Sequence, residues 1–530
     1  PEVVYTAAPA KIPAKVNQAY GAFSPDAPGM KAQPSPFPAG EPDTAIGTWF
    51  FDWEFSWPPF VPVPNSILVL IQQTSELWDN DLFLVTGETA FVDPEVLIAD
   101  FLELVDFARS LGIFGTDGSA LPTVPKADAA MELAEKVKTF EPEGSLAETQ
   151  LLLRGEDAEG IYLNGELLEP SATAEGDAED ADLAETGEED SEGLPNFFDI
   201  LHEYLAEKYE ENEEDPEKDP FAGVIGEWES PYAVDPGHEV VTGANLVINE
   251  ASIVQAWLDA PVIAVAGDAV RLDVVSQVNV MKSTATSLGA DAVLPSEMLN
   301  GVALEYESAA DPDEPDAPAK SGLFPENWTV VSIDADVVAV NWVQQYVFAS
   351  DFDRTEITVS GQDTFIGMGE NVLSNVVQLA ELGFHYDLIM VGGDMVTMNI
   401  VDQKNVLLDE DTVGGLATGP VDLMAGDNLQ YNQAEVKQTG LDQITEMQDN
   451  FRTAMKDMAE GKKDLAREIA EDARFQGKSE LKALHIEGDL IKANIVEQHN
   501  FLGDSDQIEL MLDGFSPGGG PVKLVTGSNA

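Results

Sequence analysis

The feature that most constrains how this chain can fold is its excess of negative charge. The sequence holds 98 Asp and Glu against 26 Lys and Arg, a formal net charge of −72 over 530 residues. Such self-repulsion destabilises a compact state at low ionic strength, whereas in molar salt the Debye length falls to roughly 3 Å. We interpret the acidic residues as the solvated surface of a halophilic protein, with high salt or cations as partners. A calcium-loaded surface protein is the main alternative, although the acidic residues do not form loops of regular ligand spacing.

The rest of the composition indicates a folded protein of several domains. Hydrophobic residues make up 44% of the chain, enough for packed cores, and the length corresponds to roughly three to four domains. The sequence contains no Cys, which excludes disulfides, thiolate metal sites and thiol catalysis. It also lacks the long apolar run of a membrane helix and the residue order of a signal peptide. We therefore expect a soluble protein without a membrane partner.

The N-terminal region, residues 1–43, is predicted to be an extended arm. Prolines interrupt it too often for a continuous helix or a central strand. They are Pro9, Pro13, Pro25, Pro28, Pro34, Pro36, Pro38 and Pro42. The arm could lie across the acidic surface of a neighbouring copy, or pack locally as a chain terminus.

An aromatic strand is predicted just after the arm, because large aromatic residues alternate with Asp52, Glu54 and Ser56. A sugar or a base can stack on such a row, but a core or a subunit interface is the more common role. We predict that the row lies at assembly contacts. Its residues are Trp49, Phe51, Trp53, Phe55 and Trp57.

The aromatic strand begins an α+β segment, residues 44–154. Two short strands are predicted at Ile67–Ile71 and Leu82–Val85. A helix is predicted to begin at Asp93-Pro94, where Asp can cap and Pro suits the first helical position, and another at about Ala127.

Residues 155–220 are predicted to be an acidic insertion or linker with one helix. Its run from Ser171 to Gly193 is acidic, of low complexity and without aromatic residues, which is typical of a solvated loop. Before that run, Asn164-Gly165 lies between apolar pairs and predicts a hairpin.

The main core is predicted at residues 221–440 as an α/β unit, in which Trp328–Val359 is the strongest β region. A helix is expected at Ser252–Leu258. The last segment, residues 441–530, is predicted to hold a long amphipathic helix from Leu441 to Phe475, followed by terminal strands.

The core is organised around residues 371–408. Apolar residues from Val372 to Ala380 recur at helical spacing and predict a buried helix, with Gly383 suited to its C-terminal end. A short buried strand is then predicted at Asp387–Val391, and Asp394 can cap a second helix that runs to Asn399.

This order of helix, Leu382-Gly383-Phe384 turn, strand at Tyr386–Met390 and short helix resembles a segment of the HK97-type major capsid proteins of tailed viruses. The resemblance implies an HK97-like fold and a capsid role. The expected fold class is therefore α+β and multi-domain, with mixed β-sheets, packed helices, an extended N-terminal arm and an acidic insertion.

Sequence motifs for phosphate binding, zinc proteolysis or serine hydrolysis are missing from the chain. We predict no catalytic residue, no cofactor, no enzyme activity and no sequence-specific nucleic-acid binding, and metal binding stays open. Close acid pairs can act as glycosidase carboxylates or cation ligands, although they also arise by chance in so acidic a chain. They are Asp334/Asp336, Asp351/Asp353 and Asp504/Asp506.

The first functional hypothesis is a virion structural protein, a capsid subunit that self-assembles into the shell of an archaeal virus with a halophilic host. Its location would be the virion, and its partners would be copies of itself and other virion proteins. One alternative is a cell-surface or filament structural protein of a halophile. Another is an extracellular hydrolase that uses an acidic pair.

Overall fold

The protein is mixed α/β, with mostly strands in several sheets and few helices. The computed structural model describes residues 66–80, 82–84, 90–114, 127–140, 161–164, 166–168, 238–243, 245–255, 260, 262–283, 292–294, 296–307, 324–325, 327–359, 364–369, 371–381, 386–416, 421–426, 428–439, 447–460, 469, 471–512 and 522–526. The predicted arm, the aromatic strand and the acidic run at 171–193 lie outside these residues.

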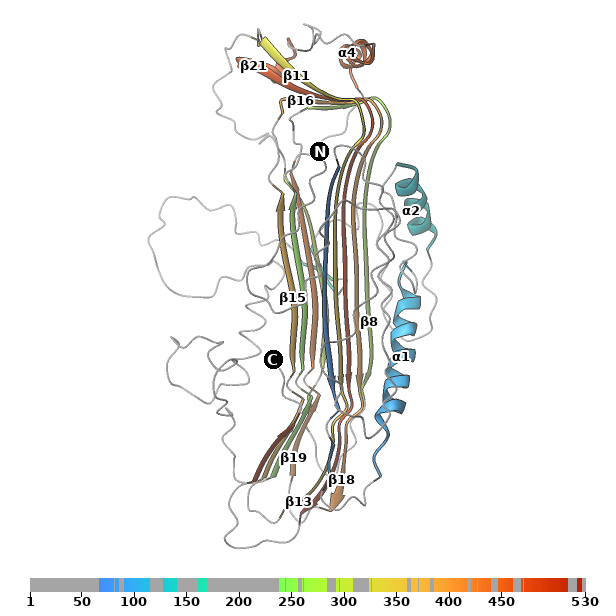
Figure 1. The fold of residues 1–530 in the computed structure, drawn as a ribbon, viewed down its shortest axis with the longest axis vertical. Helices are drawn as coiled ribbons and strands as arrows, with labels where there is room; N and C mark the ends of the chain where they lie inside the picture. The colour runs from blue at the N-terminus through green and yellow to red at the C-terminus, as the bar shows by residue number, and fades with distance from the viewer. Residues whose placement is uncertain are drawn as a thin grey trace, which may run out of the picture.

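Two sheets of long strands lie face to face along the long axis of the molecule (Figure 1). The first, here the long sheet, contains in spatial order β1 (Ser66–Asp79), β12 (Val337–Asp351), β22 (Leu490–Asp504), β17 (Met395–Asp409) and β8 (Ala269–Ser283). The second, the facing sheet, contains β15 (Val372–Glu381), β6 (Leu246–Gln255), β20 (Leu429–Thr439), β10 (Glu297–Glu307) and the hairpin β3 (Ile161–Leu163) and β4 (Glu166–Leu168).

Three smaller sheets continue the long ones at their ends (Figure 1). The upper sheet contains β11 (Asn327–Ile333), β21 (Glu480–Ile486), β16 (Leu388–Val391) and β7 (Ile263–Val265). One lower sheet contains β18 (Thr412–Leu416), β23 (Gln507–Leu512), β13 (Arg354–Val359) and β2 (Leu82–Phe83). The other contains β24 (Val522–Thr526), β14 (Thr364–Met368), β5 (His238–Gly243), β19 (Val421–Gly426) and β9 (Ala292–Leu294).

The chain passes through these sheets in stacked rungs. We call one circuit of the chain through the sheets a rung. A rung contributes one strand each to the upper sheet, the long sheet, the two lower sheets and the facing sheet, in that order, as β16 to β20 do. Neighbouring rungs pair in parallel and in register, so that Asn341, Asn494 and Asn399 lie side by side. Within the described residues, only the β3–β4 hairpin introduces antiparallel pairing.

Neighbouring rungs are not consecutive in sequence. In the long sheet β22 lies between β12 and β17, although it follows both of them along the chain. The rung that contains β22 is completed by β5 and β6. β5 lies between β14 and β19 in a lower sheet, and β6 lies between β15 and β20 in the facing sheet. One central rung is therefore assembled from two distant parts of the chain.

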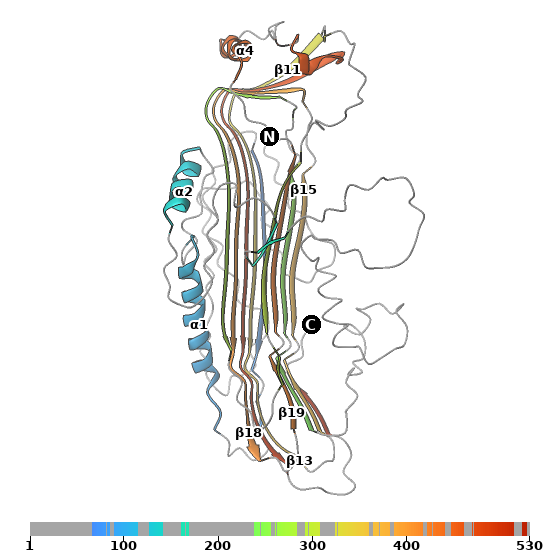
Figure 2. The same cartoon turned by 180° about the vertical axis from the view of Figure 1, so that it is seen from behind.

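Helices α1 (Pro94–Leu111) and α2 (Ala127–Thr139) cover the outer face of the long sheet (Figure 2). The predicted start of α1 is confirmed, because the Asp93 side chain accepts a hydrogen bond from Glu95 N at 3.0 Å and Pro94 begins the helix. Leucine and aromatic residues of α1, including Phe101, pack on Phe348 and Phe501 of the sheet. None of the helices in the described part of the chain has the length and apolar character to cross a membrane.

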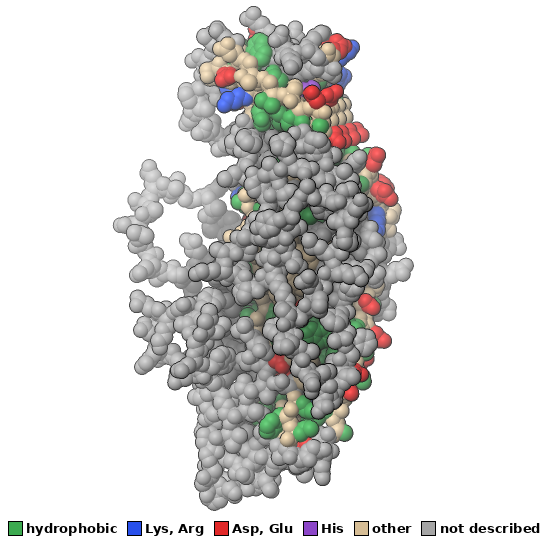
Figure 3. All heavy atoms as spheres, in the orientation of Figure 1, with side chains coloured by type: hydrophobic (Ala, Val, Ile, Leu, Met, Phe, Trp, Pro, Cys, Tyr) green, Lys and Arg blue, Asp and Glu red, His purple; other side chains and the backbone are tan. Residues whose placement is uncertain are grey.

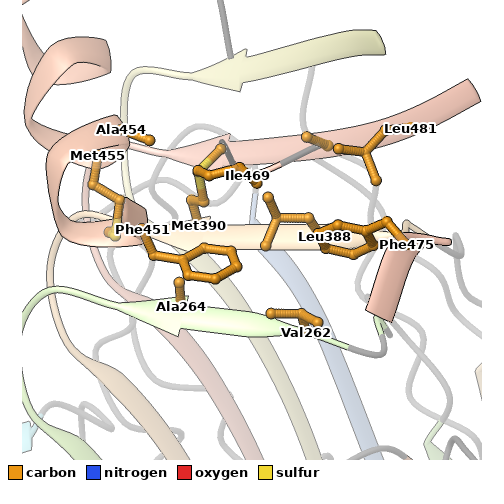
Figure 4. Packing of buried hydrophobic residues seen from close by; sticks show 11 residues of the cluster. Val262, Ala264, Leu388, Met390, Phe451, Ala454, Met455, Ile469, Phe475 and Leu481 are labelled. Carbon is orange, nitrogen blue, oxygen red and sulfur yellow. The ribbon is translucent and has the colours of Figure 1, made fainter. Parts of the chain in front are cut away.

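A third helix, α4 (Asp449–Ala459), covers the upper sheet. Phe451 and Met455 of α4 pack against Leu388 and Met390 of β16 (Figure 4). The predicted helix from Leu441 to Phe475 is wrong in its extent, because its C-terminal end is a separate 3-10 turn, Ala473–Phe475. Asp472 Oδ1 accepts from Arg474 N at 3.1 Å and begins this turn, which buries Phe475 in the same core.

The organising stretch folds differently from the prediction. The expected helix at Val372–Ala380 is strand β15, and the expected short helix at Asp394–Asn399 belongs to strand β17. Ser252 to Gln255, predicted to be helical, end strand β6. In β15 apolar residues lie on the inner face, as Val377 does, and also on the outer face, as Val376 does, while the inner face includes the buried Asn375. The sequence therefore lacks an apolar period of two and imitates a helical period. The described residues on which the HK97-type resemblance rested therefore belong to three consecutive strands, β15, β16 and β17, while Leu382-Gly383-Phe384 lie outside the described residues.

Other predictions for this part of the chain are confirmed. Trp328–Val359 is β-rich and forms β11, β12 and β13. The hairpin at Asn164 is present, with Asn164 in the left-handed region at φ 48°, a conformation that Asn tolerates. The terminal strands predicted after residue 480 are β21 to β24.

Candidate metal centre

Alternating amide and apolar layers fill the space between the long sheet and the facing sheet. In one amide layer, Gln498 donates to Gln345 Oε1 at 2.8 Å, Gln403 donates to Gln498 Oε1 at 2.8 Å, and Gln277 donates to Gln403 Oε1 at 3.0 Å. Each rung therefore passes a hydrogen bond to the next through identical side chains. Such ladders require parallel in-register pairing, because a shift by one residue would turn the whole set to the other face.

An asparagine layer follows the glutamine layer. Asn500, fully buried, donates to Asn405 Oδ1 at 3.1 Å and to Asn432 Oδ1 at 3.0 Å, and accepts from Asn249 at 2.7 Å. The asparagines come from both sheets, so these bonds hold the two sheets together as well as the rungs.

The last layer of the interior is made of carboxylates. Asp79, Asp351, Asp504 and Asp409 are the final residues of their strands and lie side by side in the long sheet. A second set of buried carboxylates lies two residues after Asp351, Asp504 and Asp409. We call the two sets together the aspartate ladder. The second set is Asp353, Asp506 and Asp411.

Backbone and amide donors hold the ladder in place. Asn371 donates to Asp351 Oδ2, and Asn428 donates to Asp504 Oδ2, each at 2.7 Å. In the second set, Asp506 Oδ1 accepts from Asp353 N at 3.1 Å. The other oxygens of three of these carboxylates have no hydrogen-bond partner although they are buried. They are Oδ1 of Asp351, Oδ1 of Asp504 and Oδ2 of Asp506.

The electrostatics of the ladder oppose its ionisation. Burial, followed by repulsion from neighbouring aspartates, raises the pKa of Asp351, Asp504 and Asp506 well above the usual range. Burial and the charge of Asp409 raise the pKa of Asp411 to about 7. Two arrangements relieve this repulsion near neutral pH: the carboxyls retain protons, or a cation lies among them.

Three of the carboxylates have the geometry of a cation site. Asp409, Asp411 and Asp504 each present an oxygen such that the three oxygens lie within 4.8 Å of one another. All three side chains are buried. Oxygens bound to one calcium ion, at 2.3–2.6 Å each, lie at most about 5 Å apart.

The structure brings together two of the three predicted acid pairs. Asp351/Asp353 and Asp504/Asp506 both belong to the aspartate ladder, whereas Asp336 lies in a turn beside the upper sheet, where its Oδ1 accepts from Asp489 N at 2.9 Å. The aromatic residues predicted for assembly contacts, Trp49, Phe51, Trp53, Phe55 and Trp57, lie outside the described residues.

Sequence reasoning missed Asp409 and Asp411, the pair that completes the site. The sequence does contain a signal for this pair. Each of the three Asp pairs is preceded by a segment with Asn, Val and Gln at alternate positions. This pattern begins at Asn341, Asn399 and Asn494. Reading it as a repeat would have placed all three pairs at equivalent positions.

A second buried polar cluster lies on the outer face of the long sheet. The Lys404 ammonium pairs with the Asp402 carboxylate, and both contact His499 Nε2. Burial and the Lys404 charge lower the pKa of His499 to about 4, whereas the Lys404 and His499 contacts hold the pKa of Asp402 below its usual range despite burial. Each charge has a partner, so the cluster fits a role in fixing the sheet more than one in binding.

Comparison with protein-family models, with curated proteins and with solved structures gave no match to this chain.

Proposed function

We propose that this protein is a structural protein, a repeated subunit of an assembly that exists in high salt. The virion shell of a virus with a halophilic host is the first candidate for that assembly. A cell-surface layer or filament of a halophile is the second. In either setting the protein acts through its shape, rigidity and contacts with copies of itself.

The observation that supports this proposal is the use of the interior for cross-rung hydrogen bonding. The amide ladders continue from rung to rung, and satisfied buried networks of this kind rigidify a fold. In the described residues, β1 and β8 are the edge strands of the long sheet, and each is a long strand. Long strand edges are sites where another chain can pair, a property that favours filaments and layers in particular.

The hydrolase alternative receives no support from the two acid pairs of the aspartate ladder. Asp351, Asp353, Asp504 and Asp506 are all 0% exposed, whereas a glycosidase carboxylate must reach the scissile bond of its substrate. Their surroundings are backbone and amide groups of the same fold.

Acidic side chains on the surface explain why the assembly would require salt. Figure 3 shows Asp and Glu side chains along the edge of the molecule that carries α1 and α2. Copies with a net charge of −72 repel at low ionic strength, and screening in molar salt leaves apolar contact to dominate at short range.

Sedimentation velocity over a range of concentrations in molar KCl, followed by negative-stain microscopy, tests the proposal. We expect concentration-dependent assembly, and removal of residues 1–43 should impair it. Closed shells would favour the virion role, and layers or filaments the cell-surface role. A wild-type chain that stays monomeric at every concentration would overturn the proposal.

A further inference from the structure

We propose that Asp409, Asp411 and Asp504 bind a calcium ion inside the fold, at the end of the long sheet. This site goes beyond the structural role and does not depend on assembly. Its ligands come from two neighbouring rungs, one containing β17 and β18 and the other containing β22.

The first argument is geometric. The three carboxylate oxygens lie within 4.8 Å of one another, a spread that one calcium ion can bridge. The oxygens are positioned before any ion binds, because Thr242 Oγ1 donates to Asp411 Oδ2 at 2.5 Å and Asn428 donates to Asp504 Oδ2 at 2.7 Å. Ser296 likewise donates to Asp409 Oδ2 at 3.0 Å.

The second argument is the set of unpartnered oxygens. Asp504 Oδ1 belongs to a side chain with 0% exposure and has no hydrogen-bond partner. The same holds for Asp351 Oδ1 and Asp506 Oδ2, which are the adjacent carboxylates of the ladder. A buried carboxylate oxygen without a donor is costly, and a cation satisfies several of them at once.

The choice of ion follows from the donors and from burial. Carboxylate oxygens are hard ligands that suit Ca²⁺ or Mg²⁺. Mg²⁺ usually keeps several of its waters and demands a near-ideal octahedron, whereas Ca²⁺ accepts irregular shells of protein oxygens. A closed interior between β-strands therefore favours Ca²⁺.

The ion would link parts of the chain that are distant in sequence. Asp504 lies in the central rung, which is assembled from two distant parts of the chain, and Asp409 and Asp411 lie in the rung beside it. Because these carboxylates meet only in the folded state, calcium binding stabilises folding.

Isothermal titration calorimetry and thermal unfolding, both at constant molar KCl, test the site. The protein is first treated with EDTA and then titrated with CaCl₂ or MgCl₂. We expect Ca²⁺ to bind and raise the Tm, and Mg²⁺ to bind far more weakly. Asp504→Asn should lose most of the rise in Tm, while Asp100→Asn, which removes an exposed carboxylate of α1, should keep it.

The two variants also separate a metal site from a merely structural carboxylate. In EDTA, Asp504→Asn should be at least as stable as the wild type, because the neutral amide takes no part in the repulsion among the buried carboxyls; in Ca²⁺ the order should reverse. If Asp504→Asn does not fold, the calorimetry of the wild type still decides. Absence of calcium binding, an equal response to Mg²⁺, or an unchanged calcium response in Asp504→Asn would each overturn the proposal.

Discussion

Asn500 shows how much a single interior residue contributes to this fold. Its side chain donates to Asn405, Asn432 and the Tyr431 carbonyl, and accepts from Asn249, with no exposure to water. One side chain therefore joins two neighbouring rungs and both sheets. Loss of this side chain removes a donor from three buried acceptors and an acceptor from Asn249, and each hydrogen bond lost in a buried network is costly.

We predict that Asn500→Ala destabilises the protein by about 2 kcal/mol or more. Asn500→Leu should be no better, because it restores volume without restoring donors. Asn327→Ala, at an exposed position of β11, should change stability by less than about 0.5 kcal/mol. Urea unfolding in molar salt measures all three, and a leucine variant as stable as the wild type would show that packing, rather than hydrogen bonding, is what the position requires.

His499 gives the fold a pH-dependent component. Its ring lies edge-on to the Tyr346 ring, with the ring centroids 4.7 Å apart, and contacts Lys404 and Asp402. The charge of Arg109 also lowers the pKa of His499. The folded pKa, about 4, is below the unfolded value of about 6.5. The unfolded chain therefore takes up the proton first, and this component of stability is lost as the pH falls from about 6.5 towards 4.

We predict that His499→Gln is less stable than the wild type at pH 8 and that the gap narrows in acid. Below pH 6.5 the difference in free energy of unfolding between the two proteins should decrease by up to about 1.4 kcal/mol per pH unit. Denaturant unfolding of both proteins at several pH values in one salt concentration measures this difference, in which other titrating groups largely cancel. A gap that stays constant with pH would contradict the prediction.

At the scale of elements, the turns between the upper sheet and the long sheet form a repeated device. Asp336 Oδ1 accepts from Asp489 N, Asp489 Oδ1 from Asp394 N, and Asp394 Oδ1 from Asp268 N, each at 2.8 to 2.9 Å. Each turn thus caps the turn of the next rung. The stacking is close enough that a Cβ at Gly488 would lie 2.8 Å from Asp336 N.

We predict that Gly488→Ala destabilises the protein by about 1–3 kcal/mol, because the backbone of the neighbouring turn cannot move aside. Gly414→Ala is the matched control. There a Cβ would come too close only to the end of the Glu509 side chain, which can rotate away, and would lie 3.8 Å from the nearest backbone atom, Ile508 O. Thermal unfolding of both variants measures the contrast, and equal effects would argue against tight stacking of the turns.

The strand β15 illustrates where prediction from sequence stops. Helices α1 and α2 and the Asn164 hairpin were predictable, because capping residues, prolines and turn residues act locally. Val372 to Ala380 were not, since apolar residues lie on both faces of β15 and the buried face includes Asn375, so the apolar pattern has no period of two. The acid pairs Asp351/Asp353 and Asp504/Asp506 could be found because each pair is local in sequence. That the two pairs lie in one ladder could not be predicted, because it depends on pairing between distant strands.

At the scale of the whole molecule, charge sets the conditions for folding. We predict that dialysis from molar KCl to about 0.1 M unfolds the protein, because the repulsion within a net charge of −72 is then no longer screened at short range. Far-UV circular dichroism follows the loss of strands. The experiment is run with EDTA and again with Ca²⁺, so that general screening is separated from occupation of one site. An unchanged spectrum at low salt in EDTA would contradict the prediction.

The central rung, made of β5 and β6 together with β21 to β23, sets the order in which the molecule can be built. In a solenoid whose coils follow one another, each new coil docks on the last, and folding can keep pace with synthesis. Here β12 and β17 leave the ribosome before β22, the strand that must lie between them. β12 can already pair with β1, and β17 with β8, but each lacks its second neighbour until that later strand is available. A nascent chain stopped after β20 would therefore have a gap in the middle of the stack, and the contacts of β22 with β12 and β17 would form only near the end of translation.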